Sequence, residues 1–416
     1  MNVDPYRSKR YARLGIALAC CSVISLAACA KIDPDSTAQN TKTDAQATTS
    51  GISSAPIQII QTQQYSIGLH QIAEGLQHPW SIAFLPDGEI LVTERAGRLR
   101  RIVDQQLLAQ PVTGLPEIHA IGQGGLLDLA LHPDFANNRW LYFSYTDRTS
   151  DGLTTNLARG RYENGVLTQV QRLFSALPRS GQGQHFSGRV VFDRSGDVYL
   201  SIGDRGEMQR AQDRNDHAGS VIRLHDDGRI PADNPWVGQP NVKPEVYSWG
   251  HRNIQGMTVH PVTGEIWVTE HGARGGDEVN RIGRGQNYGW PLVTHGVNYD
   301  GQPISTQTER ADLVSPLLHW TPSIAPSGLT FYTGSDFPAW RGQLLSGALK
   351  DRLISRVSVK HNNPSGQKTD WQATEQERFL QDFGQRIRDI RQAPDGTLWL
   401  LTDERDGQVL QLKPAP

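Results

Sequence analysis

The amino-acid sequence predicts an all-β protein, and within that class a six-bladed β-propeller. The chain of 416 residues is rich in glycine (41) and proline (24), and no stretch shows a long heptad or amphipathic helical pattern. One theme also recurs along it: an apolar strand, a turn of the Pro-Asp-Gly type, a second apolar strand and a short polar stretch. Each such hairpin buries one face against its neighbours, so the set has to close into a ring to remove exposed edges.

Six copies of this hairpin are expected to form the blades, at spacings of roughly 45 to 75 residues that suit a propeller with long inserts. In chain order they occupy residues 81–94, 127–145, 188–202, 256–270, 328–347 and 387–402. The last copy, with Ala-Pro-Asp-Gly at 393–396, closely matches the first, with Leu-Pro-Asp-Gly at 85–88. We therefore expect one propeller domain over 65–416, whose axial channel gathers residues from every blade.

The N-terminus is expected to be a lipoprotein signal peptide over residues 1–28. Four basic residues between positions 7 and 13 precede an apolar run over 14–27 that is short for a permanent membrane span. The run ends in Leu-Ala-Ala-Cys at 26–29, which resembles a bacterial lipobox, so Cys29 would carry the lipid. Ordinary cleavage nearby without lipid is the alternative. In both cases we expect export to the periplasm, and Ala30 after the cysteine suits the outer membrane. A flexible polar tether is expected over 29–60.

The composition argues against a nucleic-acid partner. The 41 Lys and Arg residues are offset by 43 Asp and Glu residues, for a net charge of −2, whereas a nucleic-acid binder shows a strong basic excess. We therefore expect no nucleic acid, and contact with a membrane only through the N-terminal lipid. Maturation at Cys29 would leave one of the three cysteines, so no internal disulfide is expected.

A histidine and a carboxylate are predicted to meet at one end of a strand pair. His185 precedes the apolar run at 189–192, and Asp204 follows the next run at 198–202. If these runs are neighbouring antiparallel strands joined by a turn at 193–197, both side chains come to the same end of the pair. An imidazole next to a carboxylate is a usual arrangement for a general base. A histidine–aspartate pair that simply holds a loop is the alternative.

Four cations are expected at equivalent blade positions, near one end of the channel: Arg252, Lys350, Arg386 and Arg388. Arg386 and Arg388 alternate, so in a strand both side chains would point to one face. A cationic cluster in a chain with almost no net charge suits a compact polyanionic ligand, because guanidinium groups pair with carboxylates two bonds at a time. Arginines on a solvated strand face are the alternative for any one of them.

The segment Thr-Glu-His-Gly-Ala-Arg-Gly-Gly-Asp-Glu at 269–278 is predicted to be a loop with free carbonyls and nearby carboxylates. Hard oxygen ligands of this kind favour Ca²⁺ over zinc. His271 has no second histidine at ligand spacing, so a transition-metal site is not expected here.

Seven motifs are specific as a set: Gly-Gln-Gly-Gly at 122–125, His-x-Ser-Gly-Arg at 185–189, Ile-Gly-Asp at 202–204, Gly-His-Arg-Asn-x-Gln-Gly at 250–256, Asn-Tyr-Gly-Trp at 287–290, Ile-Ala-Pro-Ser at 324–327 and Arg-x-Arg-Asp at 386–389. With them the chain resembles the pyrroloquinoline-quinone (PQQ) dependent aldose sugar dehydrogenases, the soluble glucose/sorbosone dehydrogenase family of six-bladed propellers. The likeness extends over residues 75 to 413.

This resemblance implies roles for particular residues. His185 looks like the base that removes the proton of the anomeric hydroxyl, Asp204 supports it, and Arg252 stabilises negative charge on the quinone oxygen. The residues that look like quinone contacts are Gln123, Arg252, Asn253, Tyr299, Lys350, Arg352, Arg386 and Arg388. The carbonyls of Gly272 and Ala273 resemble ligands of a catalytic calcium, and Glu278 and the Tyr288 carbonyl resemble ligands of a structural calcium. Gln184 and Gln209 would contact the substrate.

The chain departs from the family pattern at two of these positions. Ala273 stands where the best-known glucose oxidisers have proline, a change that keeps the carbonyl ligand. Gln184 replaces an acidic neighbour of the base, which leaves the sugar preference open.

The expected function is PQQ- and calcium-dependent oxidation of aldose sugars at C1 to lactones, with electrons passed on to a quinone or a cytochrome. A calcium-dependent propeller lactonase or esterase, or a non-catalytic binding propeller, are the rival hypotheses. The sequence leaves open the physiological sugar, the electron acceptor, and whether the protein is a monomer or a homodimer.

Overall fold

The computed structural model describes residues 55–362 and 371–415. The predicted signal peptide, Cys29 and residues 29–54 of the predicted tether lie outside the described residues. Within the two described ranges, no helix combines the length and the apolar character needed to cross a bilayer.

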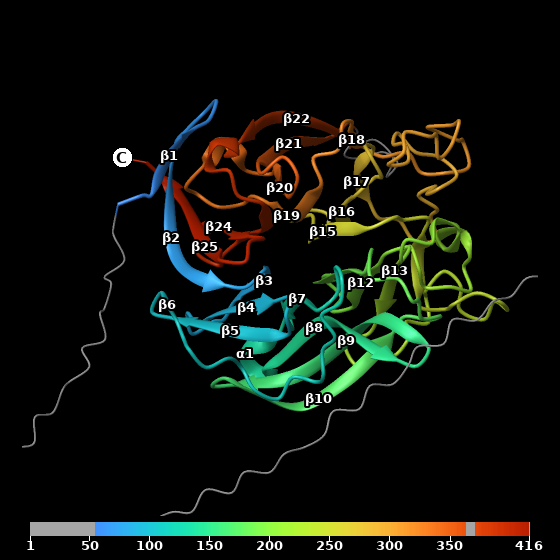
Figure 1. Ribbon diagram of the computed structural model, residues 1–416, viewed down its shortest axis with the longest axis horizontal. Helices are drawn as coiled ribbons and strands as arrows, with labels where there is room; N and C mark the ends of the chain where they lie inside the picture. Colours follow the sequence, from blue (N-terminus) through green and yellow to red (C-terminus); the bar gives the residue numbers. More distant parts are fainter. Residues whose placement is uncertain (1–54, 363–370, 416) are drawn as a thin grey trace, which may run out of the picture. The chain divides into compact units, whose positions relative to one another are not determined.

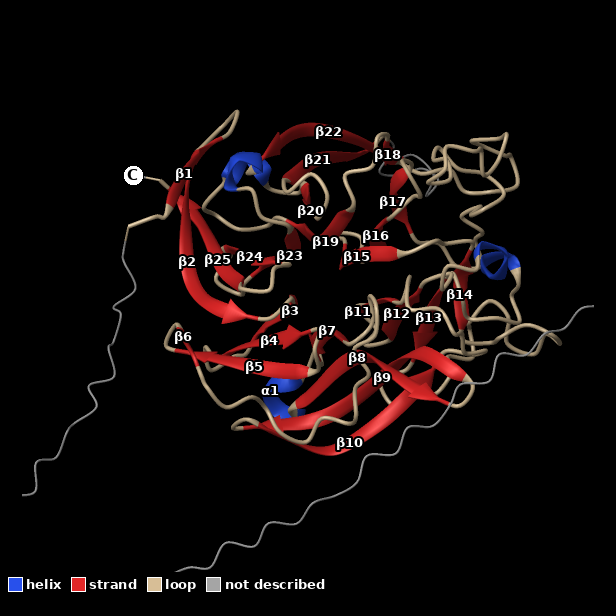
Figure 2. Cartoon of the chain, viewed as in Figure 1, coloured by secondary structure: helices blue, strands red, loops and turns tan. Residues whose placement is uncertain are grey.

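The described residues form six antiparallel sheets, which are the blades of a six-bladed β-propeller (Figures 1 and 2). The four-stranded blades are β3 (Pro79–Phe84), β4 (Ile90–Glu94), β5 (Arg98–Val103) and β6 (Gln106–Leu107); β7 (Leu126–Leu131), β8 (Trp140–Thr149), β9 (Gly152–Glu163) and β10 (Val166–Ser175); β11 (Ser187–Phe192), β12 (Val198–Ile202), β13 (Ser220–Leu224) and β14 (Val246–Trp249); β15 (Ile254–Val259), β16 (Ile266–Glu270), β17 (Asp277–Arg281) and β18 (Leu318–Trp320); and β19 (Pro326–Phe331), β20 (Leu344–Ala348), β21 (Ile354–His361) and β22 (Trp371–Phe379). The last blade contains β1 (Gln58–Gln61), β2 (Ser66–Leu76), β23 (Ile387–Gln392), β24 (Leu398–Thr402) and β25 (Gly407–Pro414). The helical segments are α1 (Phe135–Asn138), η1 (Met208–Gln212), η2 (Pro338–Trp340) and η3 (Gln381–Phe383).

The last blade joins the two ends of the described chain. Its strand order is β1-β2-β25-β24-β23, so N-terminal strands complete a sheet begun by the C-terminal ones. β2 pairs antiparallel with β25, with Leu69 opposite Leu412. The predicted tether therefore ends too late, because Gln58–Gln61 is strand β1 and pairs with β2.

One strand of each blade lies innermost and faces the axis of the ring. These innermost strands are β3, β7, β11, β15, β19 and β23; they contact one another in this order, and β23 contacts β3. In Figure 2 they surround the centre of the ring, while the other strands of each blade lie further out. Residues at one end of these strands therefore converge, although they are far apart in the sequence.

The six predicted hairpins are the two innermost strands of the six blades, so the fold prediction is confirmed. Five of their six turns contain a glycine with positive φ: Gly88 (90°), Gly196 (85°), Gly264 (78°), Gly342 (77°) and Gly396 (89°). A residue with a Cβ atom is strained in that conformation. This explains the recurrence of glycine between paired apolar strands.

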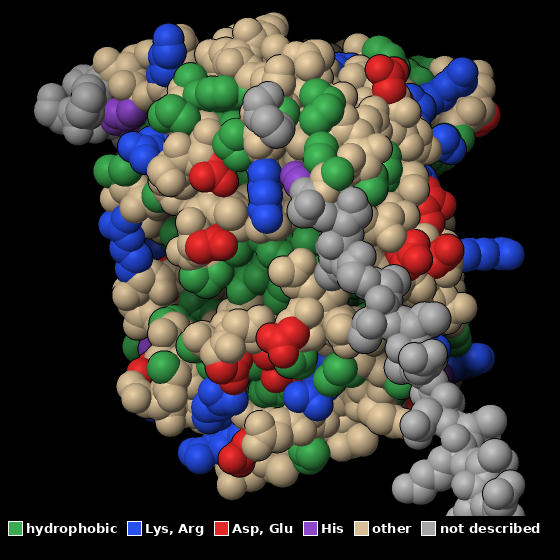
Figure 3. Space-filling model, turned by 90° about the vertical axis from the view of Figure 1, so that its left-hand side faces the viewer, with side chains coloured by type: hydrophobic (Ala, Val, Ile, Leu, Met, Phe, Trp, Pro, Cys, Tyr) green, Lys and Arg blue, Asp and Glu red, His purple; other side chains and the backbone are tan. Residues whose placement is uncertain are grey.

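Apolar side chains fill the interfaces between neighbouring blades. Trp267 on β16, for example, packs edge-on against Phe331 and Trp371 of the next blade, with ring centroids 5.6 and 5.2 Å apart. On the face drawn in Figure 3, basic and acidic side chains are interspersed around hydrophobic ones. This mixture agrees with the small net charge of the chain.

Candidate functional site

A cavity of about 150 Å³, called here the histidine cavity, lies at one end of the third blade. Its lining consists of Gln184, His185, Asp204, Gly206, Met208, Arg252, Ala273, Trp290, Asn298, Tyr299 and Ile304. His185 Nδ1 lies 2.6 Å from Asp204 Oδ1, so the predicted pair is formed. With Nδ1 engaged in this way, Nε2 is the ring nitrogen left for a ligand.

The backbone around His185 is held in an uncommon conformation. His185 has a φ of +51°, a region that costs free energy for a residue with a side chain. Its N–H donates to Gln123 Oε1 at 2.8 Å. Gly203 permits the close approach of the two strands, because a Cβ atom there would lie 2.1 Å from the His185 carbonyl oxygen. The Ile-Gly-Asp motif thus positions the histidine as well as the aspartate.

Asp204 is buried and accepts hydrogen bonds on both oxygens. Gly206 N–H donates to Oδ1 at 2.7 Å and Trp290 Nε1 donates to Oδ2 at 2.8 Å. Burial alone raises the pKa of Asp204, but the hydrogen bond from His185, the charge of Arg252 and the Gly206 N–H outweigh it and hold this pKa below its usual range. The carboxylate therefore stays ionised beside the imidazole.

Arg252 lies next to this pair and is anchored by the fourth blade. Its backbone N–H donates to Glu270 Oε2 at 2.9 Å, and its Nη1 donates to the carbonyl of His271 at 3.2 Å. Its guanidinium carbon lies 5.2 Å from the centre of the Trp290 ring. Arg252 Nε is buried and without a hydrogen-bond partner among the described residues, so the guanidinium retains capacity for an anionic ligand.

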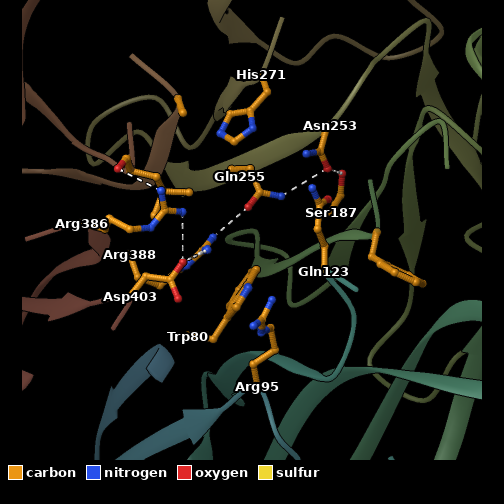
Figure 4. A pocket seen from close by; sticks show the side chains of 13 residues that line it. Trp80, Arg95, Gln123, Ser187, Asn253, Gln255, His271, Arg386, Arg388 and Asp403 are labelled. Carbon is orange, nitrogen blue, oxygen red and sulfur yellow. Dashed lines mark hydrogen bonds and ion pairs between the residues drawn. The ribbon is translucent and has the colours of Figure 1, made fainter. Parts of the chain in front are cut away.

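A second cavity of about 190 Å³, called here the cation cavity, opens on the axis (Figure 4). Its lining consists of Trp80, Arg95, Gln123, Phe186, Ser187, Asn253, Gln255, His271, Ala325, Leu349, Arg386, Arg388 and Asp403. Three arginines thus face one space with a single carboxylate: Arg388 on β23, Arg386 directly before it and Arg95 in the loop after β4. In Figure 4, His271 lies across this space from Trp80 and Arg95.

The one carboxylate of the cation cavity holds two of its arginines. Asp403 Oδ2 lies 2.5 Å from Arg388 Nη2 and 3.3 Å from Arg386 Nη2, so the two arginines share one carboxylate although Arg386 lies just before β23. Burial alone raises the pKa of Asp403, but the charge and hydrogen bonds of the arginines bring it far below its usual range. Arg388 also donates from Nη1 to Gln255 Oε1 at 3.0 Å, while its Nε is buried without a partner in the described chain.

The two cavities lie side by side. His185 lines one and Ser187 the other, and the same holds for Arg252 and Asn253 and for Ala273 and His271. A ligand held by the arginines would therefore lie next to His185.

The predicted calcium loop is folded tightly between the fourth and fifth blades. Gly272 N–H donates to Asp277 Oδ1 at 2.9 Å, and Asp277 Oδ2 accepts from Ile324 and Ala325 N–H at 2.8 and 2.9 Å. A Cβ atom on Gly272 would lie 2.0 Å from the Gly275 carbonyl oxygen, so only glycine fits. Ala273 lines the histidine cavity, which places this loop beside the candidate base.

Glu278 forms part of a separate acidic pair. It lies opposite Glu270 in the β16–β17 ladder, and burial together with the charge of Glu270 raises the pKa of Glu278 to about 8. Asn280 Oδ1 beside them is buried without a hydrogen-bond partner within the described ranges. These oxygens suit a hard cation such as Ca²⁺. No three His, Cys, Asp or Glu side chains of the described residues form a metal site by themselves, so carbonyls such as that of Tyr288 would have to contribute.

Two predicted cofactor contacts lie outside the cation cavity. Lys350 Nζ donates to the Ser323 carbonyl at 2.7 Å and pairs with Asp351 at 3.0 Å, and its side chain is 57% exposed. Arg352 has a φ of +56° and donates to the Gly384 carbonyl at 2.9 Å. Both side chains therefore have local hydrogen-bond partners, and neither is among the residues that line the cation cavity.

Two further predicted site residues lie elsewhere than expected: Tyr299, predicted as a cofactor contact, and Gln209, predicted as a substrate contact. Tyr299 lines the histidine cavity and is 73% exposed, so it lies on the side of His185 and not among the arginines. Gln184 lines the same cavity as predicted, whereas Gln209 is exposed on η1 and its neighbour Met208 contributes to the lining instead.

The sequence analysis missed several lining residues, notably Trp80, Arg95, Gln255, Trp290 and Asp403. A repeated sequence pattern points to some of them: an acidic residue ends or follows the second strand of several blades. Examples are Thr-Glu at 93–94, Gly-Asp at 203–204, Thr-Glu at 269–270 and Thr-Asp at 402–403. Asp403 was identifiable as the partner of the arginines from this pattern, and Arg95 directly follows one copy.

Known proteins share this architecture. A family model described as glucose/sorbosone dehydrogenase matches residues 76–411. Aldose sugar dehydrogenase YliI of Escherichia coli (strain K12) is 40% identical over 355 residues, which cover 84% of this chain and 93% of that protein.

Solved structures agree with this match. The soluble aldose sugar dehydrogenase from Escherichia coli in its apo-form is 40% identical with a TM-score of 0.80, covering 84% of this chain and 100% of that one. The PQQ-bound aldose sugar dehydrogenase from Streptomyces coelicolor is 26% identical with a TM-score of 0.65, covering 83% and 98%. The chain belongs to the glucose/sorbosone dehydrogenase family, a family of sugar-oxidising oxidoreductases.

Proposed function

We propose that this protein oxidises aldose sugars at C1 to lactones with PQQ and Ca²⁺. The relatives named above are aldose sugar dehydrogenases, and one of them is a PQQ-bound form. The observation that carries the proposal is the adjacency of the His185–Asp204 pair to a cavity with three arginines and one carboxylate. Arginine clusters of this kind suit a compact molecule with several carboxylates, such as PQQ.

In this proposal, His185 acts as the general base. Asp204 accepts a hydrogen bond from Nδ1–H, which fixes the tautomer in which Nε2 can accept the proton of the anomeric hydroxyl. Asp204 remains ionised and stabilises the imidazolium that forms, as its lowered pKa indicates. Gln184, Asn298 and Tyr299 line the same cavity and would orient the sugar.

The cations provide charge and position. Arg386 and Arg388 would bind carboxylates of the cofactor, and Gln123 and Asn253 would add polar contacts from the same lining. Arg252, with its unpaired Nε, would stabilise negative charge next to the sugar. When bound, PQQ would supply the acceptor for the hydride from C1, and Ca²⁺ near the carbonyls of Gly272 and Ala273 would supply a Lewis acid.

Reconstitution tests the proposal. The protein stripped of metal and cofactor should reduce an artificial dye in the presence of an aldose only when PQQ and Ca²⁺ are both added. Full sugar-dependent reduction without PQQ would overturn the assignment. Hydrolysis of a lactone without any dye reduction would instead favour a propeller lactonase.

We further propose that the mature protein is held at the membrane by a lipid on Cys29 and faces the periplasm. The support is the lipobox-like Leu-Ala-Ala-Cys at 26–29, and several acyl chains on one cysteine would hold it firmly. Mass spectrometry of the native N-terminus tests this proposal: an acylated Cys29 is expected, and an unmodified terminus elsewhere would refute lipidation while leaving export intact.

A further inference from the structure

Trp290 connects the two charged groups of the histidine cavity. Its indole Nε1 donates to Asp204 Oδ2 at 2.8 Å, while Asp204 Oδ1 contacts His185 Nδ1 at 2.6 Å. The face of the same indole lies 5.2 Å from the guanidinium carbon of Arg252. One side chain therefore contacts both the carboxylate behind the candidate base and the neighbouring cation.

The position of this indole is set by its backbone. Trp290 N–H donates to the Gly250 carbonyl at 2.9 Å, and the Trp290 carbonyl accepts from Gln212 Nε2 at 2.7 Å. Gly250 precedes the segment that carries Arg252, so the loop after β17 is pinned to the same chain segment as the arginine. Trp290 is only 7% exposed, which limits its alternative rotamers.

Trp290 belongs to the tryptophans of the chain whose indole N–H is used, as Trp320 and Trp399 donate to Glu375 and Thr397. In the described part of the molecule, the indole nitrogens of Trp236, Trp267 and Trp340 are buried without a hydrogen-bond partner. A tryptophan that serves only packing can therefore leave its N–H unused in this fold. At Trp290 the N–H instead occupies the one Asp204 oxygen that does not contact the imidazole.

We propose that Trp290 is a positioning residue, which locks the Asp204 carboxylate so that His185 keeps Nε2 free toward the substrate. This inference rests on the proposed function. Without the Trp290 N–H, Asp204 Oδ2 loses its donor, so the carboxylate can rotate away from His185 Nδ1 and the imidazole can adopt its other tautomer. The charged and titratable groups that also bear on this pair are Arg252, Arg205 and His271.

The first test uses Trp290→Phe, which keeps an aromatic face for Arg252 but removes the N–H. We expect kcat of the reconstituted enzyme to fall roughly tenfold, as for the loss of a hydrogen bond to a charged group. The acidic limb of its pH profile should shift, while retention of PQQ stays unchanged. Trp340→Phe is the matched control, because its indole N–H has no hydrogen-bond partner in the described part of the chain. This variant should leave kcat and the pH profile unchanged.

A double-mutant cycle between Trp290 and Asp204 separates a positioning role of Trp290 from a merely structural one. If Trp290 acts through Asp204, the variant Asp204→Asn should abolish the effect of Trp290→Phe, so the two losses in kcat do not add. Additive losses would overturn the proposal.

A second readout does not depend on turnover. ¹⁵N NMR of the protein without added cofactor reports the tautomer of His185, assigned by its absence in His185→Ala. The wild type should show the Nδ1–H tautomer and Trp290→Phe a mixture of both. An unchanged tautomer in Trp290→Phe would overturn the positioning role, whereas a changed tautomer in a protein that oxidises no sugar would overturn only the proposed function.

Discussion

Two groups of arginines on and around β23 have opposite environments. Deep in the channel, Arg189 and Arg391 face Asp128 and Asp389, so that two cations meet two carboxylates; we call these four residues the balanced cluster. Arg391 lies 2.5 Å from Asp128 and 3.0 Å from Asp389, and Arg189 lies 3.0 Å from Asp389.

The cation cavity at the end of the channel is not balanced. Arg95, Arg386 and Arg388 share only Asp403 among its lining residues. The two groups are in contact, since Arg189 Nη2 donates to the Arg388 carbonyl at 3.3 Å. Residue type alone therefore does not separate arginines that are balanced within the fold from those proposed to bind a ligand. The number of nearby carboxylates separates the two groups, because a buried charge without a partner is costly unless a ligand supplies one.

The largest effect is expected in the histidine cavity, next to the unbalanced cation cavity. His185→Ala should lower kcat by roughly 10²- to 10⁴-fold, because the proposed general base is lost, while PQQ absorbance persists after gel filtration. His225→Ala is the matched control, since His225 Nδ1 lies 2.7 Å from Asp197 in the same blade but lines neither cavity. Near-normal turnover of the His185 variant would mean that its pair with Asp204 is only structural.

The balanced cluster should govern stability. Arg189→Met leaves Asp128 and Asp389 buried with one cation between them, so the free energy of unfolding should fall by about 3–5 kcal/mol. Urea unfolding followed by fluorescence measures this change. The double variant Arg189→Met with Asp389→Leu restores the balance of charges and should be less destabilised than the single one; a more destabilised double variant would contradict the charge-balance argument.

Arg388→Met should affect ligand binding more than stability, the reverse of Arg189→Met. Its loss should weaken PQQ binding by about 10- to 100-fold, because a carboxylate of the ligand loses a paired donor. The loss of stability should be smaller than for Arg189→Met, because Asp403 keeps Arg386 and His78 as partners. Equilibrium dialysis measures the affinity for PQQ, and urea unfolding measures the free energy of unfolding. Arg310→Met, in an exposed pair with Asp312, should change neither.

Acid should weaken both regions. Although burial raises their pKa values, neighbouring arginines outweigh it and hold the pKa values of Asp128 and Asp403 below the usual range. Both carboxylates therefore add stability at pH values above the unfolded pKa of about 4, and this stability is lost as the pH falls through the folded values.

We expect the free energy of unfolding to decrease below about pH 5. Urea unfolding at a series of acidic pH values should show this decrease, and Asp403→Asn should make it shallower. An equally steep decrease in that variant would show that Asp403 does not contribute.

The fold and part of the candidate site could be predicted from local sequence. Turn glycines between apolar runs mark five of the six hairpins, because glycine adopts positive φ there without strain. His185 and Asp204 follow from the antiparallel pairing of two neighbouring strands. Arg386 and Arg388 are two residues apart at the start of β23, and this close spacing brings them to one carboxylate. Each of these predictions depends on residues that are close in the chain.

The parts of the candidate site that local sequence does not predict depend on the closure of the propeller ring. Arg95 and Asp403 come from opposite ends of the propeller domain, and they line one cavity only because β23 packs against β3. Trp290 reaches Asp204 from a separate blade through a loop without strands. Lys350 and Arg352 have the residue type expected of a ligand contact, and their hydrogen bonds to the carbonyls of Ser323 and Gly384 could not be predicted from local sequence. Local sequence determines which residues lie on a strand and on which face, whereas long-range packing determines which charges meet and which remain free for a ligand.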